Sequence, residues 1–211
     1  MQTRTEGKLA EYLTQTFVGD DVFASVRAAG EVRHPGMQVS PYEAQVLAWL
    51  TTISCAKRIL EVGTFMGYST LYMASALPKD GSIISLEKSK EHAGHAAAHC
   101  AQDARIEVVC TDALAWIKNY SGEKFDLIFL DAEKRQYPNY LEAALPHLNA
   151  RAWVRADKSL LWGAVSGEEP KAASKEATEA MRAFNATLAD KTKFDGVLLT
   201  TPEGLTVARR K

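Results

Sequence analysis

Apolar residues recur along this chain in two spacings, one typical of helices and one typical of buried strands. From Leu9 to Phe17 they return every four positions, and we expect residues 1–35 to be a helical segment. The stretch HPGMQVSP that follows predicts a loop, because proline and glycine interrupt regular structure. Ser40 and Pro41 then form the N-cap and first-turn pair that commonly begins a helix.

Beyond this helix, short apolar runs alternate with helical patterns. The predicted strands are RILEVG (58–63), GSIISLE (81–87), RIEVVC (105–110), FDLIFLD (125–131), AWVRAD (152–157), FDGVLLT (194–200) and GLTVARR (204–210). The predicted helices cover 68–77, 91–101, 113–120, 137–148 and 171–188. Apolar strands joined by helices indicate a parallel sheet with helices on both faces, an α/β, Rossmann-like, doubly wound fold. The short link TPEG predicts that the last two strands form a hairpin, which gives the sheet an antiparallel edge.

Composition and charge narrow the class of protein. The 211 residues suffice for one domain, which we predict to span 1–211; 46% are hydrophobic and 24% are charged. The net charge is -1 and basic residues are not clustered, so we expect no nucleic-acid or membrane partner. Neither a signal peptide nor a run of 18 apolar residues is visible, which favours a cytoplasmic protein.

Charged residues close the apolar run of the fourth predicted strand, in the sequence FLDAEK. Charged groups are costly to bury unless they are paired or used, and Asp131 and Lys134 lie where that strand ends. In open α/β sheets ligands bind at the carboxyl ends of the strands, where Asp157 closes the fifth strand. We therefore expect Asp131, Lys134 and Asp157 to belong to one site, with a plain surface Asp–Lys pair as the alternative.

A second candidate site follows the first predicted strand. In EVGTFMGYS, Gly63 and Gly67 allow a tight turn before a helix N-terminus, which can receive an anionic group. Glu87, 24 residues after Gly63, ends the second strand, where a carboxylate can accept the hydroxyls of a ribose. The pattern G-x-x-x-G departs from the dinucleotide signature G-x-G-x-x-G, which disfavours a nicotinamide-dependent oxidoreductase. A simple turn and a solvated Glu87 are the remaining alternatives.

Several motifs together resemble one enzyme family. MQVSP, RILEVGTFMGYST, the LE at 86–87, TDAL, FDLIFLDAEKRQYPNYLEAALPHL, ADKSLLWGAV and GLTVARRK occur in order over about residues 35–211. They resemble the class I S-adenosylmethionine-dependent O-methyltransferases, and most of all the caffeoyl-CoA and catechol O-methyltransferase group with its small bacterial members. The resemblance implies a seven-stranded sheet whose last strand is antiparallel, S-adenosylmethionine as cofactor and a small phenolic or catechol-like acceptor. It also implies a homodimer, with residues 1–35 capping the acceptor pocket or packing against the second subunit.

The resemblance assigns roles to individual residues. Those expected to bind the cofactor are Met37, Val39, Glu61, Gly63, Gly67, Tyr68, Ser69, Glu87, Asp112, Ala113 and Asp131. Within this set, Glu87 would hold the ribose and Asp112 with Ala113 the adenine. Lys134 would act as the catalytic base or orient the acceptor hydroxyl, and Trp162 would line the acceptor pocket. Asp131, Asp157 and the residue after Asp157 would ligate a divalent metal such as Mg²⁺.

The residue after Asp157 departs from the family pattern. The family has a neutral Asn there, whereas this chain has Lys158, and a protonated lysine cannot ligate a metal. We therefore predict a catalytic group of Lys134, Asp131, Asp157 and Lys158 in which a divalent metal binds weakly or is absent. Arg155 is expected to need a carboxylate partner, either Glu133 or Asp131. Two alternatives remain: Lys158 points into solvent while waters complete a metal site, or the protein binds the cofactor without catalysis.

Overall fold

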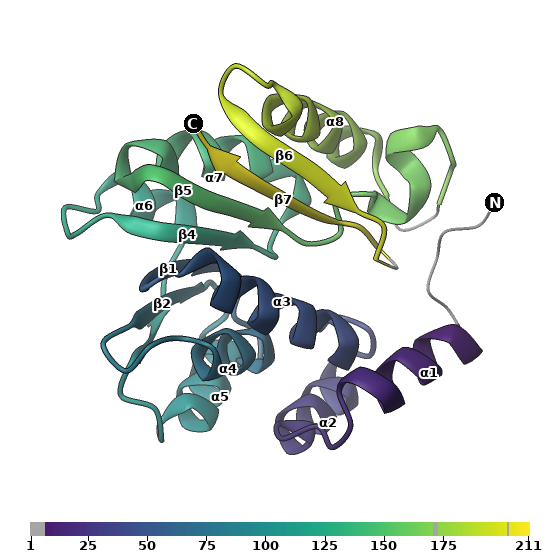
Figure 1. The fold of residues 1–211 in the computed structure, drawn as a ribbon, viewed down its shortest axis with the longest axis vertical. Coiled ribbons are helices and arrows are strands. Elements are labelled where there is room, and N and C mark those ends of the chain that lie inside the picture. The colour runs from purple at the N-terminus through teal and green to yellow at the C-terminus, as the bar shows by residue number, and fades with distance from the viewer. Residues whose placement is uncertain (1–6, 171–172, 202) are drawn as a thin grey trace. The chain divides into compact units, whose positions relative to one another are not determined.

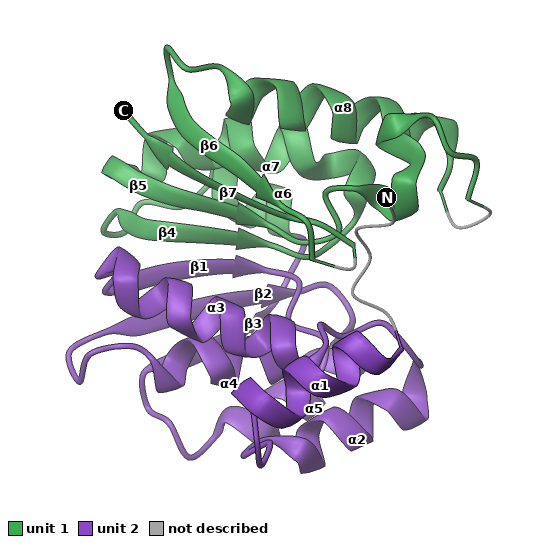
Figure 2. Cartoon of the chain, turned by 45° about the vertical axis from the view of Figure 1, so that its right-hand side comes forward, with its two compact units in different colours: residues 1–4, 113–211 green, residues 5–112 purple. Residues whose placement is uncertain are grey.

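The computed structural model describes residues 7–170, 173–201 and 203–211. The chain separates into two compact units, one of Thr5–Asp112 and the other containing Ala113–Lys211, which Figure 2 shows in different colours. The prediction that residues 1–211 make a single domain stays a prediction.

Seven strands build the sheet, in the order β3-β2-β1-β4-β5-β7-β6. Their bounds are β1 Arg58–Val62, β2 Ser82–Glu87, β3 Ile106–Cys110, β4 Phe125–Leu130, β5 Leu148–Ala156, β6 Phe194–Leu199 and β7 Leu205–Arg210. β1 and β3 pair with β2 in parallel, and β4 pairs with β5 in parallel. β7 runs antiparallel to both β5 and β6. The predicted Rossmann-like α/β sheet, mostly parallel with its last strand antiparallel, is confirmed.

In the described part of the unit Thr5–Asp112 the helices are α1 Lys8–Phe17, α2 Ala24–Arg33, α3 Pro41–Ser54, α4 Tyr68–Ser75 and α5 Lys90–Cys100 (Figure 1). The helix predicted at Ser40 and Pro41 begins there. The Ser40 hydroxyl accepts a hydrogen bond from the Glu43 N–H, and the Glu43 carboxylate accepts one from the Ser40 N–H. This reciprocal cap satisfies two backbone donors that a helix start leaves open. The first six residues of the predicted N-terminal helical segment lie outside the described part of the chain.

The unit containing Ala113–Lys211 carries α6 Ala113–Lys118, α7 Tyr137–Ala144, α8 Lys175–Ala189 and the short 3₁₀ helices η1 Lys134–Gln136, η2 Leu145–His147 and η3 Leu161–Ser166. The helix predicted over 137–148 ends early, because Pro146 has no N–H to donate. β5 begins at Leu148, four residues before its predicted start, and Arg151 within it adopts a φ of 65°. The predicted start of the last helix at residue 171 lies outside the described residues, and Ser174 caps α8.

The core of this second unit forms around β4. All of its residues except Asp126 are buried, as the apolar run predicted. The rings of Tyr137 and Phe184, from α7 and α8, pack edge to face with centroids 5.3 Å apart. Such burial fixes the carboxyl end of β4, from which the next residue, Asp131, projects. Among the residues that the structure describes, no helix has both the length and the apolar composition needed to cross a bilayer.

Candidate active site

The glycine turn after β1 has the backbone that only glycine adopts readily. Gly63 and Gly67 have φ values of 98° and 87°. A Cβ at Gly67 would lie 3.0 Å from the Cys100 sulfur of α5, so a side chain there would also be crowded. The turn therefore brings backbone N–H groups close to any ligand at the start of α4.

Glu61 and Ser69, both predicted to bind the cofactor, contact one another beneath this turn. The fully buried Glu61 carboxylate accepts hydrogen bonds from the hydroxyls of Ser69 and Ser85, each at 2.6 Å, and from the hydroxyl of Thr70. A buried carboxylate is stable only when it is satisfied in this way. Glu61 thus ties β1 to β2 and to the first turn of α4, which positions the glycine turn.

Glu87, the predicted ribose ligand, already accepts two backbone hydrogen bonds. Its two oxygens receive the N–H groups of Phe65 at 2.9 Å and Ser89 at 2.8 Å. A carboxylate can accept about four hydrogen bonds, so Glu87 can accept further donors, and His92 Nδ1 lies 3.9 Å from one of its oxygens. Asp112, the predicted adenine residue, is half exposed and lies 3.5 Å from the Lys88 ammonium, while Ala113 begins α6.

Tyr68 is held by a residue that the sequence did not single out. Its hydroxyl donates to Asp21 at 2.7 Å, and the hydroxyl of Tyr72 donates to the other Asp21 oxygen at 3.0 Å. Burial and these hydrogen bonds to a carboxylate raise the pKa of both phenols, that of Tyr72 to about 12. Asp21, in the segment that links α1 and α2, is therefore hydrogen-bonded to two residues of α4. Of the other predicted cofactor residues, Val39 is buried and Met37 is exposed.

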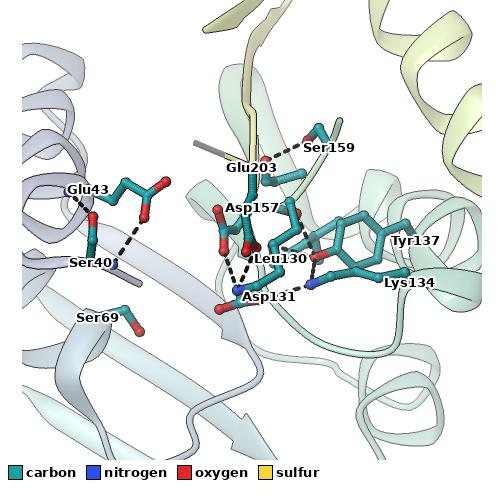
Figure 3. A network of polar contacts seen from close by, with 12 residues as sticks. Ser40, Glu43, Ser69, Leu130, Asp131, Lys134, Tyr137, Asp157, Ser159 and Glu203 are labelled. Atoms are coloured by element: carbon teal, nitrogen blue, oxygen red, sulfur yellow. Dashed lines mark hydrogen bonds and ion pairs between the residues drawn. The ribbon is translucent and has the colours of Figure 1, made fainter. Parts of the chain in front are cut away.

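The second predicted site follows β4, and three of its side chains form a hydrogen-bonded group (Figure 3). The Lys134 ammonium donates to Asp131 Oδ1 at 2.9 Å and to the Tyr137 hydroxyl at 2.7 Å. That hydroxyl has the main-chain oxygens of Leu130 and Asp157 as acceptors, at 3.0 and 3.1 Å. Tyr137 thus fixes Lys134 against the ends of both β4 and β5.

Lys158 stands at the centre of three carboxylates. Its ammonium nitrogen lies 2.8 Å from Asp157 Oδ2, 3.6 Å from Glu203 Oε2 and 3.7 Å from Asp131 Oδ1. Lys158 is 8% exposed, so the alternative in which it points into solvent is wrong. Its backbone has a φ of 57°, a left-handed conformation in which asparagine is enriched and lysine is uncommon.

The charges in this group stabilise one another. Burial alone would lower the pKa of Lys158, but Asp131, Asp157 and Glu203 reverse that effect and hold it above its ordinary value. Burial would raise the pKa of Asp131, yet Lys134 and Lys158 hold it below its ordinary value. For Glu203 burial prevails over the attraction of Lys158 and raises the pKa. Lys158 is therefore an ammonium across the physiological range.

These residues do not fit the divalent metal that the family resemblance implies. Asp131 and Asp157 do converge, as predicted for metal ligands. The group on which they converge is the Lys158 ammonium, which has no lone pair to offer a metal. Within residues 7–170, 173–201 and 203–211, no three His, Cys, Asp or Glu side chains are arranged to hold a metal ion.

Glu203 and Tyr137 were not predicted to belong to the site. Glu203 lies in the turn between β6 and β7, and Thr206 at the start of β7 pairs with Ala156 at the end of β5. Glu203, just before β7, therefore lies beside Lys158, just after β5. This proximity could be predicted only if β7 were known to lie next to β5. The Glu203 carboxylate also accepts the Trp162 indole N–H at 2.9 Å. Tyr137 had been interpreted only as a helix residue.

Arg155 was expected to pair with Glu133 or Asp131. Glu133 pairs with Arg135 at 3.0 Å, and Asp131 pairs with Lys134 and Lys158. Arg155 is fully buried, and this burial lowers its pKa to about 9. The carboxylate partner predicted for Arg155 stays a prediction, whereas Lys158 faces Asp131, Asp157 and Glu203.

Comparisons with known proteins identify the family of the chain. A family model described as O-methyltransferase matches residues 22–211. A catechol O-methyltransferase of Niastella koreensis is 33% identical over 186 residues, which cover 85% of this chain and 83% of that protein. An O-methyltransferase from Bacillus cereus, solved in complex with SAH, superposes with a TM-score of 0.84 at 27% identity, over 95% of this chain and 96% of that one. The O-methyltransferase TomG from Streptomyces achromogenes, solved with SAM, gives a TM-score of 0.82 at 27% identity, over 95% of each chain.

The seven-stranded, mostly parallel fold is thus that of a methyltransferase. The chain belongs to the O-methyltransferase family, and the resemblance inferred from its sequence motifs is confirmed. Because the family is shown, the alternative of a nicotinamide-dependent oxidoreductase is set aside.

Proposed function

We propose that this protein transfers a methyl group from S-adenosylmethionine to a hydroxyl group of a small phenolic or catechol-like acceptor. The observation that carries the proposal is the Lys134 ammonium, held between Asp131 and Tyr137 immediately after β4 in a chain of the O-methyltransferase family. The catechol O-methyltransferase activity named for its relative supports a phenolic acceptor. The solved structures of similar chains with SAH and SAM support the cofactor.

Most of the residues that would hold the cofactor belong to the unit Thr5–Asp112, which carries the glycine turn. When bound, S-adenosylmethionine supplies an electrophilic methyl carbon, whose bond to sulfur breaks as its bond to the acceptor oxygen forms. The narrow turn at Gly63 and Gly67 admits the ligand close to the backbone. Glu87 has acceptor positions left for the ribose hydroxyls. We propose that these residues, with Asp112 and Ala113 at the adenine, bind and orient the cofactor.

Lys134 would act as the general base that accepts the proton of the acceptor hydroxyl. A phenol becomes a good nucleophile as its proton leaves. Lys134 would first release one proton of its ammonium to solvent, and the neutral amine would then accept the proton of the phenol. Asp131 then stabilises the ammonium that forms, and the Tyr137 hydroxyl keeps its nitrogen in place. The Lys158 ammonium adds a fixed positive charge that stabilises the developing phenolate.

Two measurements test the proposal. Calorimetry with S-adenosylhomocysteine should show saturable binding, and incubation with methyl-labelled S-adenosylmethionine and a panel of phenols and catechols should transfer label. Absence of S-adenosylhomocysteine binding in folded protein would refute the proposal at its first step.

A second candidate function is a cofactor-binding protein without catalysis. The observation that favours it is Lys158, which fills the position of a neutral metal ligand in the family. Tight S-adenosylhomocysteine binding with no label transfer to any acceptor of the panel would support this second function over the first.

A further inference from the structure

The charged group after β4 and β5 contains its own cation. Lys158 places one ammonium within ion-pair distance of Asp131, Asp157 and Glu203, which come from three different parts of the chain. We infer that Lys158 takes the place of a divalent metal in this site, so that methyl transfer proceeds without metal and requires only one acceptor hydroxyl. The part about the acceptor rests on the proposed function; the part about the metal does not.

The segment that carries Lys158 is fixed by its own hydrogen bonds. Ser159 and Leu160 donate their N–H groups to the main-chain oxygens of Gly204 and Glu203, each at 2.9 Å. Trp162 also donates its indole N–H to the Glu203 carboxylate. The turn between β6 and β7 is therefore held against the loop that follows β5, and the ammonium cannot leave without breaking contacts on both segments.

The charge of the site is also largely compensated. Three carboxylates face the two ammonium groups of Lys134 and Lys158, so little negative charge is left to attract a divalent ion. An added Mg²⁺ would lie a few ångströms from the Lys158 ammonium and would be repelled by it. A hard divalent ion such as Mg²⁺ also prefers six oxygen ligands. Asp157 Oδ2, one of the oxygens it could use, already accepts a hydrogen bond from the Lys158 ammonium.

This difference has a consequence for the acceptor. A divalent ion can bind two neighbouring oxygens of a catechol at once, which selects for that pair of hydroxyls. An ammonium is a compact point charge with hydrogen-bond donors, and it cannot chelate two oxygens in this way. The acceptor class that fits is therefore a phenol with one hydroxyl, and a second hydroxyl beside it should confer little advantage.

Removal of the lysine should expose a latent cation site. Without the Lys158 ammonium, no positive charge would occupy the position between the carboxylates of Asp131, Asp157 and Glu203. Lys158→Asn supplies an oxygen ligand there, and asparagine suits the left-handed backbone. The exposed Lys124 on the same unit offers a matched control, Lys124→Asn, that removes one positive charge elsewhere.

Mn²⁺ binding, followed by the electron paramagnetic resonance signal of the free ion, decides the inference about metal without reference to activity. We expect no saturable binding up to 1 mM Mn²⁺ in the wild type or in Lys124→Asn. Lys158→Asn should gain one Mn²⁺ site whose dissociation constant lies at least tenfold below that 1 mM limit. Lys158→Ala should gain a site that binds Mn²⁺ more weakly than the site of Lys158→Asn. Wild-type binding at micromolar Mn²⁺ that Asp157→Asn abolishes would overturn the inference. Folded Lys158→Asn and Lys158→Ala proteins that both fail to bind Mn²⁺ would overturn it too.

Turnover then tests the acceptor class. With excess EDTA, the wild type should methylate a phenol and the corresponding catechol with kcat/KM values within about threefold of each other. Lys158→Asn with Mg²⁺ should favour the catechol at least tenfold. A wild type that loses its activity in EDTA and regains it with Mg²⁺ would contradict the inference while leaving the proposed function intact. Failure to bind S-adenosylhomocysteine would instead refute the proposed function, and the Mn²⁺ result would still decide the metal question.

Discussion

The Tyr137 hydroxyl and the Asp157 main-chain oxygen lie 3.1 Å apart, and the same hydroxyl lies 3.0 Å from the Leu130 oxygen. One phenol therefore connects the carboxyl ends of β4 and β5, the two strands from which Asp131 and Asp157 project. It also accepts a hydrogen bond from Lys134. The relative placement of the two aspartates and the lysine thus depends on a single buried hydroxyl group.

Replacement of that hydroxyl should weaken both the fold and the site. Tyr137→Phe keeps the ring packed on Phe184 but leaves buried main-chain oxygens and the Lys134 ammonium without this partner. We expect the free energy of unfolding to fall by roughly 1–3 kcal/mol, measured by chemical denaturation. The matched control is Tyr12→Phe at an exposed position, which should change stability very little. Equal stability of Tyr137→Phe and the wild type would show that the hydroxyl is not needed to join the strands.

Lys134 should matter for turnover and not for cofactor binding. Lys134→Met keeps most of the side-chain volume but removes the amine that handles the acceptor proton. We expect kcat/KM for the acceptor to fall by about 10²- to 10⁴-fold, as for the loss of a general base. Calorimetric affinity for S-adenosylhomocysteine should be unchanged. An activity loss below threefold would remove Lys134 from the mechanism.

The stability of the protein in acid should depend on Asp131. Its pKa is held below the ordinary value, chiefly by Lys134 and Lys158 acting against burial. The ionised Asp131 therefore stabilises the fold above an unfolded-state pKa of about 3.9, and this contribution disappears as the pH falls through the lower folded-state pKa. At pH 7, Asp131→Asn should cost about 3 kcal/mol or more, because the buried Lys158 ammonium and the partly buried Lys134 ammonium both lose a partner.

The measurement is denaturant unfolding of wild type and Asp131→Asn between pH 7 and pH 2.5. The difference between the two proteins should stay constant down to about pH 4 and shrink below it. Asp20→Asn, at an exposed position, serves as the control. A difference that already vanishes between pH 7 and pH 5 would contradict the depressed pKa.

Glu87 should control cofactor affinity. Glu87→Gln keeps the shape but replaces charge-assisted hydrogen bonds to the ribose, each worth on the order of 1.5–3 kcal/mol, by neutral ones. S-adenosylhomocysteine should therefore bind at least tenfold more weakly in calorimetry. Because Glu87 also accepts the Phe65 and Ser89 N–H groups, a thermal melt must confirm that the variant is folded. Glu107→Gln on β3, which is exposed, is the control, and unchanged affinity in Glu87→Gln would place the ribose elsewhere.

The homodimer implied by the family resemblance stays a prediction. α1 has no buried residue, and its Leu9, Tyr12 and Phe17 are each more than half exposed. Large apolar side chains gathered on one helix are common at subunit contacts. Sedimentation at micromolar concentration should give a dimer for the wild type and a monomer for the Leu9→Ser, Phe17→Ser double variant. A monomeric wild type would end this prediction.

Much of the fold could be predicted because the strands are long apolar runs and the helices have clear starts. Ser40 and Pro41 marked the beginning of α3, and the buried run before Asp131 marked β4. The boundary of β5 was missed, since Arg151 enters a left-handed conformation inside the strand and no sequence rule assigns that to arginine. Local signals thus gave the elements but not the irregularities that tertiary packing imposes.

The site was only partly predictable for a related reason. Asp131, Lys134, Asp157 and Lys158 are close in the sequence to strand ends, so the rule for open α/β sheets placed them together. Glu203 lies in the turn before the antiparallel strand β7, about 45 residues after Lys158, and its proximity depends on β7 lying next to β5. Lys158 could be recognised as unusual in sequence, but only its distances show that it faces the carboxylates.

A charge attached to the backbone differs from a dissolved ion in how its occupancy is set. The occupancy of a metal site depends on the ratio of the ion's concentration to its dissociation constant. A tethered group instead has a fixed effective concentration beside its partners. The Lys158 ammonium is one residue from Asp157 and is buried against it. Its positive charge can therefore be neither diluted nor removed by a chelator. The charge at this position is constant in every molecule of the protein, whatever the supply of divalent ions around it.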